Sequence, residues 1–294
     1  MATATVPISA NKVWVFYAFA LPFALLTIIF GLWPIVLSFD VSLTKSATAL
    51  RPEPDYVGLA NYAKVLSDPT FIRSLIATLF YTAIAVIANL AFALVYALLL
   101  NSTAIGPGKT FFKVAMFLPV VTPDLAGYVV WRWLYDQSFG AVNAFLKLVG
   151  LPAFGGIASP DTAVIAILIA ELWHHAGFYV LIFLANLAIC DRALEEAASI
   201  DGANRWQQFR FVTWPSISQL YLTCLLLSTI WTLGDFNSVY LLTGGGPADL
   251  THVLSTLGIR YLRLAEVDMS MATIVTALPL ILPLVYFMMK RLSR

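Results

Sequence analysis

The stretch Ala163–Ile189 reads AVIAILIAELWHHAGFYVLIFLANLAI, and it decides the fold of this chain. Its apolar residues form a continuous run without strict alternation, which predicts a helix rather than a barrel strand. The hydrocarbon core of a bilayer is about 30 Å thick, so a helix needs about 20 apolar residues to cross it. The stretch therefore predicts a membrane-spanning helix.

Five other segments have a similar length and composition. The six predicted spans run approximately over Val13–Phe39, Leu75–Leu100, Phe111–Tyr135, Ala163–Ile189, Ile217–Leu242 and Met269–Met289. The first is too long for the apolar region of a secretory signal, which has about 7–15 residues. The predicted fold class is all-α, a single polytopic membrane domain over residues 1–294.

The composition excludes several classes of protein. The chain is 60% hydrophobic and 11% charged, with a mean hydropathy of +0.85, whereas soluble domains carry about 25% charged residues. Its net charge of +1 gives no basic surface for nucleic acid. Cys190 and Cys224 lie in unrelated contexts and indicate neither a disulfide framework nor a metal site.

An even number of spans places both termini on one side of the membrane. The basic residues are denser in the short segments on the side of the termini, and the basic tail directly follows the last span, so both termini are predicted to be cytoplasmic. Residues 40–74 then form an external loop. The sequence contains no GxxxxGK[ST] phosphate loop. Energy for any transport must therefore come from a partner or from an ion gradient.

The longest cytoplasmic loop contains the sequence EEAASIDGA over residues 195–203. It predicts a short helix from Arg192 to Ile200, broken by Gly202, and then a second amphipathic piece. One interpretation is an interfacial helix that lies on lipid headgroups. The other is a rigid helical elbow that inserts into a groove of a partner protein.

This segment resembles the EAA motif of binding-protein-dependent ABC permeases. Glu196, Ala197, Ala198, Asp201, Gly202 and Ala203 match the motif, and the tail falls on Val212, Trp214 and Pro215. Trp214 departs from the usual leucine. Further stretches resemble the carbohydrate branch, similar to the maltose and glycerol-phosphate permeases: Val57–Tyr62 with Asp68–Pro69, Leu118–Pro119 with Pro123, Ser138–Gly140 with Asn143, and Leu242–Pro247.

The resemblance implies a permease subunit of type I ABC importer architecture, in a prokaryotic cytoplasmic membrane. It implies that this chain forms half of a pathway for a sugar, oligosaccharide or polyol, which moves by alternating access. The implied partners are a second homologous permease, two cytoplasmic ATPase subunits and an external solute-binding protein. The loop 190–216 would be the coupling loop. ATP and Mg would bind to the ATPases, so this chain is expected to have no catalytic residue, cofactor or metal.

Ionisable residues inside the spans are costly and should face a cavity or a partner group. Glu171, His174 and His175 lie on one side of the fourth span, and Asp124 follows Pro123, where a local kink is expected. Four interpretations remain open: a packing pair between helices, a proton relay, a metal site that would need further ligands, and the wall of a substrate cavity. Asn89, which shares a face with Thr78 and Thr82, is predicted to join helices.

The family resemblance favours the cavity wall. Carried over by motif spacing, the substrate-pathway residues are Asp124, Tyr128, Trp173, His175, Phe178, Asp235 and Asn237. Aromatic faces suit the apolar side of a sugar ring, and the two carboxylates favour a neutral ligand. Two alternatives are kept: a gradient-driven secondary transporter, which would need inverted repeats, and an intramembrane metal enzyme that uses Glu171 with His174 and His175.

Overall fold

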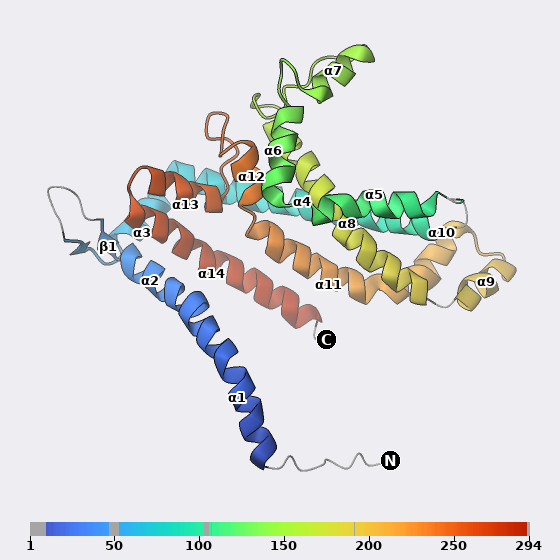
Figure 1. Cartoon of the computed structure of the whole chain (residues 1–294), viewed down its shortest axis with the longest axis horizontal. Helices are drawn as coiled ribbons and strands as arrows, with labels where there is room; N and C mark the ends of the chain where they lie inside the picture. Colours follow the sequence, from blue (N-terminus) through green and yellow to red (C-terminus); the bar gives the residue numbers. More distant parts are fainter. Residues whose placement is uncertain (1–9, 47–52, 103–105, 107, 191, 293–294) are drawn as a thin grey trace.

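The computed structural model describes residues 10–46, 53–102, 106, 108–190 and 192–292 (Figure 1). Residues 47–52 of the expected external loop and the end of the basic tail lie outside the described residues. The helices are α1 (Ala10–Leu26), α2 (Trp33–Ser42), α3 (Ala60–Ser67), α4 (Pro69–Asn101), α5 (Lys109–Val121), α6 (Asp124–Leu134), α7 (Ala141–Leu148), α8 (Ala163–Ile189), α9 (Arg192–Ile200), α10 (Arg205–Gln208), α11 (Trp214–Leu233), α12 (Asn237–Leu242), α13 (Leu254–Arg263) and α14 (Val267–Leu292).

Two π-helical segments, η1 (Thr27–Leu32) and η2 (Phe209–Thr213), connect α1 to α2 and α10 to α11. The strands β1 (Thr44–Lys45) and β2 (Asp55–Tyr56) pair antiparallel, with Thr44 opposite Tyr56. The all-α fold class predicted from the sequence is confirmed.

Among the described residues, five helices are long and apolar enough to cross a membrane. They cover Tyr17–Ser42, Pro69–Asn101, Ala163–Ile189, Arg205–Leu233 and Val267–Phe287. The count becomes six if α5 and α6, which are bent by 104° against each other, form one broken span. The structure therefore has six spans only if one of them is sharply bent.

The expected third span, residues 111–135, is not a straight helix. α5 ends at Val121, and Thr122 adopts an extended conformation with ψ 125°. Pro123 disfavours helical geometry at the preceding residue and has no N–H to donate, which explains the break. α6 then leaves the bundle sideways and carries α7 at its end (Figure 1).

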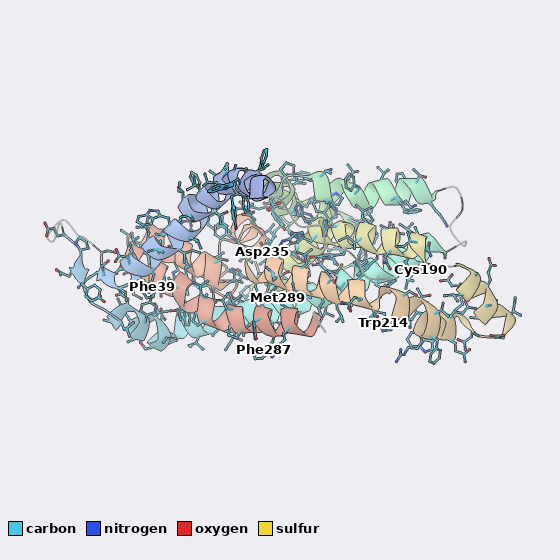
Figure 2. All side chains as sticks on the ribbon, turned by 90° about the horizontal axis from the view of Figure 1, so that it is seen from below. Phe39, Cys190, Trp214, Asp235, Phe287 and Met289 are labelled. Carbon is cyan, nitrogen blue, oxygen red and sulfur yellow. The ribbon has the colours of Figure 1, made fainter. Side chains whose placement is uncertain are left out.

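The expected fifth span, residues 217–242, is also divided. α11 begins earlier, at Trp214, and ends at Leu233, and α12 begins at Asn237. Gly234, Asp235 and Phe236 lie between the two helices. Because the helix is interrupted here, backbone N–H and C=O groups are free to bond with polar side chains. This break places Asp235 at the middle of the molecule (Figure 2).

The bundle packs around three apolar clusters. One joins α4, α8 and α11 through residues such as Leu90, Phe183 and Ile217. A second joins α3, α4, α13 and α14, and a third joins α4, α6, α8 and α12. α1 diverges from the bundle, and none of its apolar span is buried (Figure 1). α9 and α10 form one end of the molecule, opposite α3, β1 and α13.

Candidate functional site

A cluster of polar side chains lies where α4, α6, α8 and α12 meet. Its members come from segments far apart in the sequence, because the breaks before α6 and before α12 bring short helical starts against the middle of α8. The cluster has three connected parts, centred on Asp124, Glu171 and Asp235.

Asp124, the first residue of α6, links three helices. Its Oδ1 lies 3.0 Å from Nε2 of His174 on α8, and its Oδ2 accepts a hydrogen bond of 2.7 Å from the amide of Asn237 on α12. The carboxylate side chain is 44% exposed, whereas that of His174 is 7% exposed. Asp124 therefore connects α6 to α8 and α12, and its carboxylate remains accessible as a hydrogen-bond acceptor.

Glu171 is the buried part of the cluster and is only 3% exposed. The amide of Asn89 on α4 donates to both carboxylate oxygens, at 3.0 and 2.9 Å. His175 Nδ1 lies 3.4 Å from Glu171 Oε1. The prediction that Asn89 joins helices is confirmed by these contacts, and Thr78 on the same face accepts the N–H of Leu254 at 2.9 Å.

Asp235 occupies the break between α11 and α12. Its Oδ2 accepts from the hydroxyl of Tyr81 on α4 at 2.8 Å, and its Oδ1 accepts from the N–H of Ser238 at 3.2 Å. The Ser238 hydroxyl also contacts Oδ2. The backbone carbonyl of Asp235 accepts from Ser255 at 2.9 Å. Asp235 is thus held by α4, by α12 and by the start of α13.

A small cavity of about 40 Å³ adjoins the cluster. It is lined by Glu171, His175, Tyr179, Trp231, Thr232 and Asp235. Phe178 and Trp231 lie at its side with their ring centroids 5.1 Å apart. Trp173 is half-exposed and meets Trp131 edge to face at 5.8 Å. The arrangement offers hydrogen-bond acceptors and donors beside aromatic faces, which suits a ligand rich in hydroxyl groups.

The structure brings most of the expected pathway residues together. His175 and Asp235 line the cavity, and Phe178 packs against Trp231 of its wall. Asp124 with Asn237 forms the neighbouring hydrogen-bonded pair. Tyr128 is different, because it is 1% exposed and its ring packs 5.3 Å from that of His174. In this conformation, the structure places Tyr128 in the core, away from any surface that a ligand can reach.

Sequence reasoning missed four members of this site: Tyr81, Ser238, Trp231 and Thr232. Tyr81 precedes Asn89 by eight residues and so shares its face of α4. Trp231 lies four residues before Asp235, one helical turn away. Ser238 carried no such signal, because its contacts depend on the break before α12.

A second region stands at the end of the molecule formed by α9 and α10. We call residues 192–213 the elbow. Gly202 has φ +82°, a left-handed conformation that favours glycine. The N–H of Ala203 bonds to the carbonyl of Ala198, and that of Gly202 to the carbonyl of Ser199. This pair of bonds is the Schellman motif that ends a helix.

The chain restarts at once beyond this turn. Asn204 accepts from the N–H of Gln207 at 2.9 Å, and the Gln207 side chain accepts from the N–H of Asn204 at 2.8 Å. This capping box begins α10. Thr213 donates to Glu195 at 3.2 Å and ties the two arms together. The helix expected from Arg192 to Ile200 is thus present as α9, and the elbow has a defined shape.

The outer surface of the elbow combines exposed acidic and apolar side chains. Glu196 is exposed, while Ile200 is 86% exposed and Trp206 is 68% exposed. Exposed apolar residues that are gathered on one rigid feature mark interaction sites. The elbow therefore has the character of a docking surface.

Comparisons with known proteins agree with this arrangement. Residues 60–294 match the family described as the binding-protein-dependent transport system inner membrane component. The chain is 31% identical to a trehalose/maltose transport system permease protein of Thermococcus litoralis, over 95% of this chain and 94% of the relative. It is 29% identical to an sn-glycerol-3-phosphate permease protein of Agrobacterium fabrum, over 81% and 80% of the two chains.

The fold also matches solved structures. A chain of a bacterial ABC transporter involved in the import of the acidic polysaccharide alginate superposes with a TM-score of 0.83 at 22% identity. The match covers 97% of this chain and 96% of the other. The resemblance inferred from the EAA loop is confirmed: this chain belongs to the family of binding-protein-dependent transport system inner membrane components.

Proposed function

We propose that this chain forms half of the translocation pathway of an ATP-driven importer for a sugar, oligosaccharide or polyol. A second homologous permease supplies the other half, and two ATPase subunits bind ATP and Mg beneath it. An external binding protein delivers the solute. The chain itself carries out no covalent chemistry, and its spans alternate between two orientations. Family membership supports this function over a gradient-driven transporter and an intramembrane metal enzyme.

The elbow is the observation that carries the proposal. Its two short helices, its Schellman turn and its exposed apolar residues form a compact projection at one end of the bundle (Figure 1). We infer that this end is cytoplasmic, with both termini on the same side, and that residues 190–216 dock on an ATPase subunit. The uncovered α1 supports the presence of a partner permease, because an apolar helix that diverges from the bundle and is not buried offers a surface for another chain.

Charge reversal on the elbow tests this docking. Glu196→Lys places a cation in the expected contact, so capture of the ATPase subunit should fall about tenfold, the effect of losing about 1.4 kcal/mol. Gly202→Val forces a branched side chain to adopt φ +82° and should have a similar effect. Gly202→Asn tolerates that conformation and serves as the control. Glu53→Lys, an exposed charge reversal at the opposite end, is the second control. Normal capture by both elbow variants would refute the docking.

We further propose that the polar cluster is the wall of the solute pathway. Asp124, His175, Asp235 and Asn237 supply hydrogen-bonding groups, and Trp173 and Phe178 supply aromatic faces. Two carboxylates repel an anion, so the proposed solute is neutral. The relative from Thermococcus litoralis is a trehalose/maltose transport system permease protein, which supports a sugar.

Transport by reconstituted complexes tests the pathway. Trp173→Ala should lower solute uptake while basal ATP hydrolysis stays unchanged, because Trp173 is half-exposed and lies about 24 Å along α8 from Ile189, beyond which the elbow begins. Leu79→Ala, an exposed apolar position on another helix, is the matched control. Equal uptake by Trp173→Ala and the parent protein would remove Trp173 from the pathway. The solute itself is best identified by binding measurements on the external binding protein.

A further inference from the structure

A long apolar slot runs along the outside of the bundle between α4, the beginning of α8 and the loop 249–253. Its volume is about 610 Å³. The floor is made by buried residues, including Tyr81, Ile167 and Val239, and the walls include Ile76, Phe80 and Ile165, which are 60%, 61% and 52% exposed. The slot is thus open along its length and almost wholly apolar.

The slot has a direction. Its residues on α4 begin with Arg73 and end with Ile84, at helical spacing along one face. At a rise of 1.5 Å per residue, these ends are separated by about 16 Å. That length equals the hydrocarbon thickness of one leaflet, about 15 Å. The charged lining residues are Arg73 and Asp249. Asp249 lies at the Arg73 end of the slot, because its partner Arg260 directly precedes Tyr261, which donates to Asp68 just before α4.

Arg73 is the available cation at the polar end. Its Nε donates a long hydrogen bond of 3.4 Å to the carbonyl of Pro69 in its own helix, and it has no carboxylate partner in the part of the chain that the structure describes. Asp249 also lines this end, but its carboxylate is engaged by Arg260 at 2.9 Å and by His252 at 3.3 Å. The negative charge of Asp249 is therefore already compensated within the loop and α13.

We propose that this slot binds a membrane phospholipid, with one acyl chain along α4 and the phosphate on Arg73. An apolar hollow does not hold water, and the solvent around a membrane helix is lipid. Guanidinium groups bind phosphate through two parallel hydrogen bonds. The cation at one end and the leaflet-long apolar floor match the two parts of a phospholipid. The inference concerns the membrane surface and does not depend on which solute is carried.

The slot also touches the polar cluster through Tyr81. The Tyr81 ring forms part of the floor, while its hydroxyl donates to Asp235 at 2.8 Å. A bound acyl chain packs on one side of the ring and so restricts its movement. Lipid in the slot is therefore expected to stabilise the position of Asp235.

Photo-crosslinking tests the proposal on the assembled transporter in lipid nanodiscs. The probe is a phosphatidylglycerol with a photoreactive group in its acyl chain, and the labelled peptides are identified by mass spectrometry. We expect labelling of the α4 segment 76–84. Ile165→Trp fills the slot from α8 at an exposed position and should abolish this labelling. Ala77→Trp is a second filling variant. Arg73→Gln should reduce the labelling about tenfold, the effect of one lost charge-assisted contact.

A neighbouring hollow supplies the matched control. It lies between α4 and α11, is lined by residues such as Ile87 and Leu225, and has no charged lining residue. Ile87→Trp should leave the labelling of segment 76–84 unchanged. The proposal is overturned if Arg73→Gln and the filling variants label like the parent protein. It is also overturned if Ile165→Cys cross-links to the second permease, because another protein would then cover the slot.

Discussion

Replacing Asn89 with leucine tests how much the buried contact between α4 and α8 contributes to stability. One amide satisfies both oxygens of Glu171, at 3.0 and 2.9 Å, and Glu171 is 3% exposed. Interhelical bonds in membranes average about 0.6 kcal/mol and reach about 1.7 kcal/mol. Because this contact reaches both carboxylate oxygens from one amide nitrogen and is buried, we expect a loss near the upper membrane value, about 1.5 kcal/mol.

The loss is measured as thermal unfolding of the purified protein in detergent, where for 294 residues it corresponds to a Tm lower by about 2–3 °C. Thr82→Val is the matched control, because the Thr82 hydroxyl is buried on the same helix and has no partner among the described residues. Its replacement should be nearly neutral. A cycle with Glu171→Leu should show a coupling of about 1–2 kcal/mol, since the double variant removes both partners. Equal effects of Asn89→Leu and Thr82→Val, or an additive cycle, would refute the reasoning.

Three further predictions concern close contacts and pH. A Cβ at Gly177 would lie 2.0 Å from the carbonyl oxygen of Met116 on α5, so Gly177→Ala should cost about 1–3 kcal/mol in thermal unfolding, whereas Gly31→Ala, with its nearest neighbour 3.9 Å away, should cost nothing measurable. Gly245 has φ +99°, and a Cβ at this position would overlap the His252 ring, so Gly245→Ala should lower the yield of folded protein, and an unchanged yield would contradict this close approach. Burial lowers the pKa of His252 from 6.5, opposed by Asp249 and assisted by Arg260. The folded protein therefore binds this proton less well than the unfolded chain does. The contribution of neutral His252 to the free energy of unfolding is fully present above about pH 6.5 and is lost as the pH falls below that value. His252→Gln should flatten this dependence of Tm on pH.

Hydropathy was sufficient to predict the class of fold, but not the bends. α8 has the bounds Ala163–Ile189 expected from its apolar run. By contrast, the sequence around Pro123 and around Gly234 stays apolar on both sides of the break, so hydropathy predicts one continuous span at each of these places. A proline predicts a kink at Pro123. Its size, 104°, depends on how α6 packs against α8 and α12, which the local sequence does not contain.

The candidate site was predictable only within single helices. Helical spacing placed Glu171 with His175, and it placed Asn89 on a face that joins helices. Contacts between helices, such as Asp124 with Asn237 or Tyr81 with Asp235, depend on helix tilt and register. Those quantities follow from packing of the whole bundle. The elbow was easier to predict, because α9, the turn at Gly202 and the start of α10 are all determined by residues that are neighbours in the sequence.

Docking of the elbow on an ATPase subunit is tested most directly by cross-linking in the assembled transporter. Ser199→Cys introduces an exposed thiol on α9, and Ser138→Cys introduces one beyond α6 at a site remote from the elbow in sequence. A short bifunctional reagent should join Ser199→Cys, and not Ser138→Cys, to the ATPase subunit. If Ser199→Cys gives no such product in a complex that hydrolyses ATP, the elbow is not the contact through which that hydrolysis drives transport.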